Sequence, residues 1–590
     1  MKNSIGNIFF LVPLIAILIL LLFGKSEKEL GFADNKIFKF SYLSESSPSF
    51  CNGGKSLKFQ DLPDAKLLSG IGNSHWKIST SSDSAQIYFN QGINALHAFW
   101  DLEAFKAFKK GLKFDSISAI MHWGLSKSIS QTAGELGALR KQSMVKAVTL
   151  SKEANDYEKD FILASNELLA NGFKSYKSSM ESYLKTYPNQ IDAKLFYASS
   201  LSTGVRSHSP EGIPTPENIR GQEILNRVLK TNPNSSAANH YLIHALENGP
   251  EPQKALKNAE RISNLAPSAG HITHMPGHIY YRIGDYDKAN LAFYNSMRVD
   301  SIYMRKFKMD PINNWNYTHN LDYLVASCAE SGRYKEGLKW ATLLSNINID
   351  RSRSMTGGSG YILFGAYTSI PRFYMRFEEW KNASKSIDSL IGKIPWVNTM
   401  AIKYFNGMKN YTKGMNNIEL DNIEKASENL IQLNVINEKL QNERPEIAAD
   451  WYFRYAAKIL LVNAQELNAL IEYKKGNASK AILLLKKACI EERNIGYWEP
   501  PHYTRPVYET LAKIYTEEGD INKAEESYRL ALKLRPRNGH TQFALANSME
   551  ILRKSPSDIK TAYVQFLNNW KSSDDFNNRI THAKTYIRNN

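Results

Sequence analysis

Regularly spaced histidines are the residues of this chain whose type and pattern could do chemistry. Five of its thirteen histidines lie in two short segments, NHYLIHALE beginning at residue 239 and GHITHMPGHIY beginning at residue 270. His240 and His274 are 34 residues apart, and the same interval separates His244 from His278. Histidines four residues apart share one face of a helix and can chelate a metal ion, each through one nitrogen. Each segment is therefore a candidate metal-binding helix.

An interval of 34 residues is the repeat length of the tetratricopeptide repeat (TPR), a hairpin of two helices. In this pattern, small residues stand where the helices approach closely, and large or aromatic residues fill the remaining space. The clearest copy contains Tyr508, Leu511, Ala512, Tyr515, Gly519, Ala524, Tyr528, Ala531 and Pro536. Because no run of alternating strand residues is present, we predict an all-α fold, a superhelical solenoid of TPR hairpins.

The histidines occupy equivalent positions of successive repeats. Other copies pair Gly92 with Phe108 and Gly277 with Phe293. In this register, positions 2, 5, 9 and 12 of the first helix share the face that a TPR solenoid turns toward its concave groove. The residues predicted at these positions in three neighbouring repeats are His240, His244, Glu247, His271, His274, His278, His319 and Asp322.

This set of side chains predicts a metal site in the groove. Imidazoles from helices packed roughly 8–10 Å apart can converge on one ion, and a carboxylate can act as ligand, imidazole orienter or general base. Nitrogen and oxygen donors together suit a divalent transition metal such as zinc, iron, copper or manganese. The alternative is that the imidazoles bond one another, buried backbone and Tyr241 or Tyr280, and shape a groove for a peptide or anionic ligand. The sequence has no HExxH motif, so the standard zinc-protease arrangement is excluded.

The N-terminus carries an apolar run from Ile8 to Phe23, interrupted only by Pro13. Sixteen helical residues at about 1.5 Å each come close to crossing a bilayer core of roughly 30 Å. We predict an uncleaved signal-anchor over residues 1–24, which holds the rest of the protein outside the cytoplasm in the cell envelope. A cleaved signal peptide, with a secreted or periplasmic body, is the alternative. Either location argues against nucleic acid as a partner.

Composition adds little about function. The 74 basic and 58 acidic residues give a formal net charge of +16. Such a surface favours anionic partners such as acidic glycans or lipid headgroups, although a solvated lysine-rich surface explains the charge equally well. The three cysteines are far apart and form no CxxC pattern, so neither a disulfide framework nor a thiolate metal site is predicted.

Changes in composition along the chain predict its organisation. A polar tether over residues 25–82 follows the anchor and precedes TPR-like helices over 83–202. Two segments rich in Pro, Gly or Ser, 203–218 and 346–372, read as loops within one superhelix. The repeats that carry the histidines fill 219–345 between them, and C-terminal repeats fill 373–590.

These motifs resemble those of an uncharacterised family of large bacterial TPR proteins. The likeness extends from about Ala85 to Met549 and includes both histidine segments, His319-Asn-Leu, Glu499-Pro-Pro501 and Pro536-Arg-Asn-Gly539. It implies the TPR superhelix but brings no assigned activity. Members of the family tend to have a second histidine where this chain has Asp322, and an aromatic residue where it has His502.

Three functions are compatible with these observations. The first is an envelope-anchored TPR scaffold that binds a protein or peptide through its histidine-rich groove. The second is a metalloprotein, either a hydrolase or an oxidoreductase, that uses the same histidines. The third is an accessory protein in the uptake or degradation of anionic polysaccharides. The sequence favours a binding protein over an enzyme.

Overall fold

The computed structural model describes residues 62–130, 134–203, 207–209, 211–347, 365–393, 399–442, 450–496, 498–501, 503–574 and 578–590. Within these ranges the chain forms 25 α-helices, three short 3-10 helices and no strand, apart from one isolated β-bridge between His208 and Pro214. The all-α prediction is confirmed. The predicted signal-anchor over 1–24 lies outside the described residues, as does Cys51.

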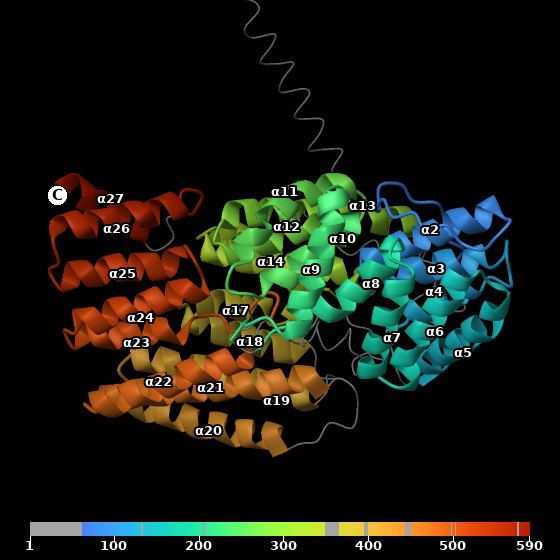
Figure 1. The fold of residues 1–590 in the computed structure, drawn as a ribbon. Helices are drawn as coiled ribbons and strands as arrows, with labels where there is room; N and C mark the ends of the chain where they lie inside the picture. Colours follow the sequence, from blue (N-terminus) through green and yellow to red (C-terminus); the bar gives the residue numbers. More distant parts are fainter. Residues whose placement is uncertain are drawn as a thin grey trace, which may run out of the picture. The chain divides into compact units, whose positions relative to one another are not determined.

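The helices follow one another along the chain, and each packs mainly on its sequence neighbours (Figure 1). The first half comprises α2 (Asp83–His97), α3 (Asp101–Gly111), α4 (Ala119–Lys127), α5 (Gly134–Leu150), η3 (Ser151–Glu153), α6 (Asp156–Ala170), α7 (Phe173–Thr186), α8 (Ile191–Ser202), α9 (Pro216–Thr231), α10 (Ser236–Glu247), η4 (Pro252–Ala255), α11 (Leu256–Leu265), α12 (Gly270–Arg282) and α13 (Tyr286–Phe307). The second half comprises η5 (Pro311–Asn313), α14 (Trp315–Glu330), α15 (Tyr334–Ser345), α17 (Ser369–Arg376), α18 (Trp380–Lys393), α19 (Thr399–Glu419), α20 (Ile423–Asn442), α21 (Asp450–Lys474), α22 (Ala478–Ile495), α23 (Val507–Glu517), α24 (Ile521–Leu534), α25 (Gly539–Ile551), α26 (Pro556–Asn569) and α27 (Arg579–Asn589).

Glycines at the predicted small positions set the distance between paired helices. A side chain at Gly92 of α2 would collide with the ring of Phe108 on α3, and one at Gly277 of α12 would collide with Phe293 on α13. Both rings are fully buried. The two hairpins therefore pair residues as the TPR pattern predicts, because only glycine lets the backbone lie against the aromatic face.

Local signals decide where the histidine-bearing helices begin. The side chain of Ser235 accepts a hydrogen bond from the backbone N–H of Ala238 and caps α10. The side chain of Asn314 caps α14 in the same way through Tyr317. Helix α12 has no side-chain cap and begins at Gly270, where any side chain would collide with the carboxylate of Asp300. These starts determine the register of the histidines on each helix.

The structure places the ends of the two predicted loops a few residues earlier than the sequence does. Helix α9 already begins at Pro216, behind its N-cap Thr215. Helix α17 begins at Ser369, so the last four residues of the predicted loop 346–372 are helical. Loop composition marked both interruptions, but the caps and tertiary contacts decide where helix resumes.

Repeats that are far apart in sequence are in contact. The hydroxyl of Tyr286 donates to the carbonyl of Pro536 at 2.9 Å, and the indole N–H of Trp570 donates to the carbonyl of Glu330 at 2.8 Å. The buried carboxylate of Glu330 also pairs with Arg376 at 2.9 Å and with Arg535 at 2.6 Å. Burial alone would raise the pKa of Glu330, but the two guanidinium groups lower it below its usual value. The C-terminal repeats are thus joined directly to the repeats that carry the histidines.

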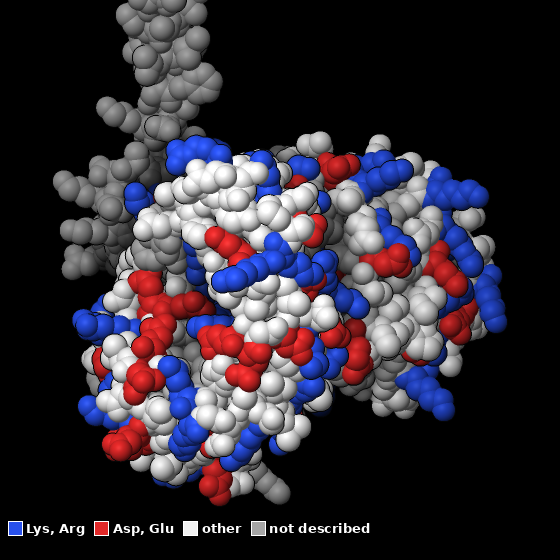
Figure 2. Space-filling model, turned by 90° about the vertical axis from the view of Figure 1, so that its left-hand side faces the viewer, with Lys and Arg blue, Asp and Glu red and all other residues white. Residues whose placement is uncertain are grey.

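The distribution of charged side chains on the surface does not indicate a partner of one charge. On the face shown in Figure 2, basic and acidic side chains are interspersed and no extended patch of one sign is visible. That face therefore gives no support to the predicted anionic glycan partner. Among the helices in the described ranges, none has the length and apolar content needed to span a membrane.

The packing at Gly92 can be tested by Gly92→Ala. The added methyl group meets the Phe108 ring, so we expect the free energy of unfolding to fall by about 1–3 kcal/mol through overpacking. Gly392→Ala is the matched control, because nothing lies within 4 Å of its added carbon, and it should be neutral or stabilising by up to about 1 kcal/mol. Urea denaturation followed by circular dichroism measures both. Equal stability of the two variants would contradict the predicted close approach.

Candidate metal centre

The six histidines predicted for the groove lie together and form two groups of three. One group is His240, His244 and His271; the other is His274, His278 and His319. In each group, one ring nitrogen per residue lies within 4.8 Å of the other two. The groups are built by α10, α12 and α14, which pack side by side. We call them the first and the second triad.

The imidazoles are buried, which the groove prediction did not anticipate. His240, His274 and His278 have 0% relative exposure. His271 and His319 are also buried, and the side chain of His244 keeps only 12% exposure. The triads therefore lie inside the solenoid instead of lining an open surface, and every polar atom in them needs a partner.

The Nδ1 atoms of three histidines face oxygen acceptors that cannot donate a proton. Nδ1 of His240 lies 2.6 Å from the carbonyl oxygen of His97. The two carboxylate oxygens of Glu247 accept from Nδ1 of His244 at 2.7 Å and from Nδ1 of His278 at 2.6 Å. One carboxylate thus holds a histidine of each triad. These contacts place a proton on each of the three Nδ1 atoms, and in a neutral ring Nε2 is then the atom with the free lone pair.

Two asparagines orient two more histidines, and one buried carboxylate orients both asparagines. The amide oxygen of Asn320 accepts from Nδ1 of His274 at 2.7 Å, and that of Asn316 lies 3.4 Å from Nδ1 of His271. The amide nitrogens of Asn316 and Asn320 donate to Asp300 at 2.7 and 3.3 Å. Because one Asp300 oxygen accepts from both amide nitrogens, each amide turns its own oxygen toward the imidazole.

The Nε2 atoms of the same histidines point inward, toward one another. Nε2 of His244 and Nε2 of His271 are 3.3 Å apart, and Nε2 of His274 and His278 are also in close contact. Nε2 of His240 is buried and has no hydrogen-bond partner. With the protons on Nδ1, these contacts join lone pairs that repel. Two nitrogens bound to one tetrahedral ion at about 2.0–2.1 Å lie roughly 3.3 Å apart, which is the separation found in the first triad.

The surroundings of four of these imidazoles favour their neutral form. Burial, reinforced by neighbouring histidines, lowers the pKa of His240, His271 and His274 well below the usual value. The same causes lower the pKa of His319 to about 3. Neutral imidazole is the form that binds a metal ion. A buried cluster of neutral imidazoles resists protonation but can accept a metal ion.

Glu247 is the charged member of the centre. Burial would raise the pKa of its carboxyl group, but interactions with His244 and His278 lower it below the usual range. The group is therefore a carboxylate at neutral pH. A buried anion of this kind favours positive charge nearby.

Phe99 covers the first triad in an unusual backbone conformation. Its φ of 52° is left-handed, a region that bulky residues rarely adopt. Its ring stacks on His244 and on His271 with centroids 5.3 Å apart in both pairs, and meets His240 edge-on at 4.7 Å. Strained residues of this kind persist where the surroundings fix them, frequently at functional sites.

The structure treats the two predicted carboxylates differently. Glu247 joins the triads, whereas the buried Asp322 forms an ion pair with Arg372 at 2.6 Å and belongs to neither triad. In place of Asp322, Glu499 approaches the second triad, with one oxygen 3.5 Å from Nδ1 of His278 and 3.9 Å from Nε2 of His319. Glu247, His278 and Glu499 form a third group of potential ligands.

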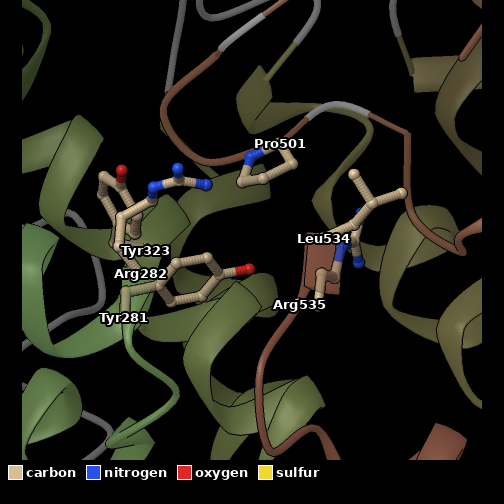
Figure 3. A pocket seen from close by; sticks show the side chains of 6 residues that line it. All are labelled: Tyr281, Arg282, Tyr323, Pro501, Leu534 and Arg535. Atoms are coloured by element: carbon tan, nitrogen blue, oxygen red, sulfur yellow. The ribbon is translucent and has the colours of Figure 1, made fainter. Parts of the chain in front are cut away.

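Sequence reasoning did not select Glu499 as a site residue, although its Glu-Pro-Pro motif was among those that carry the family resemblance. It lies 180 residues or more from every histidine of the two triads. The same loop brings Pro501 opposite Tyr281, Arg282 and Tyr323, with Leu534 and Arg535 nearby (Figure 3). The space between these side chains is only about 10 Å³, which is room for one water molecule. Here the chain itself fills the groove that was predicted to hold a peptide.

Comparison with known proteins supports the repeat and little else. Residues 506–538 match the tetratricopeptide repeat family, and this is the copy that the sequence showed most clearly. The chain thus contains a tetratricopeptide repeat within an all-helical fold. No curated protein is significantly similar to it in sequence. The likeness to a wider bacterial family stays a prediction.

Matches to solved structures have low sequence identity and low TM-scores. Human IFIT1, solved as a dimer with m7Gppp-AAAA, is 13% identical, and the match covers 84% of this chain and 92% of IFIT1 with a TM-score of 0.32. The APC/C hetero-tetramer Cut9-Hcn1 is 12% identical and yeast Tom70 is 13% identical; each match covers 86% of this chain and 96% of the other, with a TM-score of 0.28. Function must be inferred from the site itself.

Asp300 gives this site a testable pH dependence. Burial raises its pKa to about 7, although the amides of Asn316, Asn314 and Asn320 partly oppose that shift. In the metal-free protein, the native state therefore keeps a proton that the unfolded state has lost above about pH 4. Stability should fall as the pH rises toward 7, and Asp300→Asn removes this loss.

The comparison is the unfolding free energy of wild type minus that of Asp300→Asn, measured in chelator at pH 5 and pH 8. We expect this difference in unfolding free energy to decrease by about 3 kcal/mol between pH 5 and pH 8. The loss occurs over the two pH units between pH 5 and the native Asp300 pKa of about 7, at about 1.4 kcal/mol for each unit. Taking the difference cancels the titration of all other groups. Parallel pH profiles for the two proteins would show that Asp300 is ionised throughout.

Proposed function

We propose that this chain is a metalloprotein that binds two divalent transition-metal ions, one in each histidine triad, inside its TPR solenoid. The observation that carries the proposal is the orientation of five imidazoles: their Nδ1 atoms face oxygen acceptors, and their Nε2 atoms converge. Metal-binding histidines characteristically donate the other ring N–H to a carboxylate, carbonyl or amide oxygen, which fixes both the tautomer and the ring orientation.

The alternative, a purely structural cluster, fits this orientation less well. A buried polar atom without a partner costs about 1–3 kcal/mol, and Nε2 of His240 has none. Reversing the tautomer of His244 or His278 would remove the repulsion at Nε2 but would leave Nδ1 against the Glu247 carboxylate without a proton. A cation between the Nε2 atoms satisfies both sides of each ring and also gives Nε2 of His240 a partner.

The donor set indicates what the ions would be and do. Three imidazole nitrogens suit zinc, copper or iron. Three protein ligands leave a position for water or another molecule, as in catalytic zinc sites, where the ion lowers the pKa of the bound water. Glu499 lies beside His278 and His319, within reach of a molecule bound at the second triad. The arrangement therefore supports hydrolytic chemistry as well as simple metal binding.

The cellular setting of this centre is a further part of the proposal. The apolar run between residues 8 and 23 supports an envelope protein, held by an anchor or exported by a signal peptide. The TPR architecture supports a protein partner on the surface of the solenoid. Neither role conflicts with a buried metal centre.

Metal stoichiometry tests the two triads separately. The full chain, produced without a metal-binding tag and equilibrated with zinc, should hold two ions by inductively coupled plasma mass spectrometry. His240→Ala and His274→Ala should each lose one ion, because each removes a ligand from one triad, and the double variant should lose both. His122→Ala is the control, since this buried histidine lies outside both triads. Two ions retained in the double variant would refute the assignment.

Thermal stability provides an independent test. A ligand of the folded state present at 100 times its dissociation constant stabilises by about 2.7 kcal/mol. We therefore expect a chelator to lower the melting temperature of the wild type and zinc to restore it. The double variant His240→Ala/His274→Ala should show no response to either. If neither chelator nor zinc changes the melting temperature of the wild type, the result contradicts metal binding.

A further inference from the structure

A cavity of about 250 Å³ opens beside the first triad. It lies where the beginnings of α3, α12 and α14 meet. Its wall includes His271, whose ring belongs to the triad, and Phe99, which covers the triad. The volume approaches the roughly 300–1,000 Å³ of pockets that hold small molecules, so a ligand of one ring fits best.

Aromatic side chains dominate the apolar part of this wall. Phe99, Trp100 and Trp315 all line it. Trp315 is 48% exposed, although its ring also lies 5.1 Å from that of His271. A tryptophan half open to solvent beside a cavity has apolar area available for a ligand, because its ring faces are not enclosed by the core.

The polar part of the wall carries two carboxyl groups, and basic side chains lie outside the lining. Asp101 and Asp300 line the cavity together with Ser128, Ser130 and Asn316. Burial raises the pKa of Asp101 to about 6, and Lys127 opposes that shift. Near the same wall, Arg140 donates to the carbonyl of Ser130 at 3.3 Å. The carboxylates disfavour an anionic ligand here, and Lys127 and Arg140, which lie outside the lining, offset part of their attraction for a cationic one.

We propose that this cavity binds a neutral, polyhydroxylated ring, a sugar unit, stacked on Trp315 and Trp100 with its hydroxyl groups bonded to Asp101 and the asparagine and serine side chains. A sugar ring presents an apolar C–H face to an aromatic ring and hydroxyl groups at its edge. The edge groups both donate and accept, as the carboxyl, amide and hydroxyl groups of this wall do. The proposal departs from the anionic glycan expected from the net charge.

The position of the cavity connects it to the proposed metal centre. A ring that fills the space next to His271 brings an oxygen toward the open coordination position of an ion in the first triad. This part rests on the proposed function, whereas the stacking on Trp315 does not. Zinc-loaded protein should therefore bind the sugar more tightly than metal-free protein, and the metal-free protein should still bind it.

The test compares neutral, cationic and anionic sugars that share one ring skeleton. The full chain, zinc-loaded and metal-free, is titrated with D-glucose, N-acetyl-D-glucosamine, cationic D-glucosamine and anionic D-glucuronate. Saturation-transfer NMR follows binding, and the metal content is measured on the same samples. We expect at least one neutral sugar to bind at least tenfold more tightly than both charged sugars, and Trp315→Ala to weaken that binding at least tenfold with its metal content unchanged.

Leu483→Ala serves as the control, since Leu483 is a large exposed side chain, 69% accessible, on the distant helix α22. It should leave sugar binding unchanged. The proposal fails if no neutral sugar binds, if a charged sugar binds as tightly, or if Trp315→Ala binds like wild type. The metal content distinguishes failure of this proposal from failure of the proposed function. If two ions are bound but no sugar binds, only the cavity assignment is wrong.

Discussion

The arrangement of the centre depends on one carboxylate. Glu247 is buried between the triads and accepts hydrogen bonds from His244 and His278 at the same time. This double contact fixes the tautomer and the rotation of one histidine in each triad and couples α10 to α12. It also supplies buried negative charge to the centre. A cation at the Nε2 side resolves both the lone-pair repulsion and the charge, so the geometry of Glu247 leads directly to the proposed metal centre.

A second constraint on the site is that the C-terminal repeats pack against the repeats that carry the histidines, which we call closure of the solenoid. TPR superhelices typically present a concave surface to partners, but here the chain returns to its own histidine repeats. Tyr286 bonds to Pro536, Trp570 bonds to Glu330, and the loop of Glu499 reaches His278 and His319. The region predicted as a peptide groove is therefore interior space. Water exclusion there strengthens electrostatic interactions, which suits a metal site better than a docking surface.

A cavity borders the first triad. It is lined by the half-exposed Trp315 and by His271, a member of that triad. Asp300 serves both features, since it lines this cavity and also orients the asparagines behind His271 and His274. A change of charge on this one group is thereby transmitted to the triads and to the cavity wall.

Sequence alone determined the fold class and which histidines share a face. The 34-residue interval and the small–aromatic pairs such as Gly92 with Phe108 are local patterns, and helix geometry converts them into a register without further information. The sequence did not predict which side chains from distant segments contact the site. Only the tertiary structure decided that Asp322 pairs with Arg372, that Glu499 replaces it beside His278, and that the imidazoles are buried. The reason is that repeat spacing specifies neighbours along a solenoid, whereas closure brings together residues more than 200 positions apart through side-chain packing that no local pattern encodes.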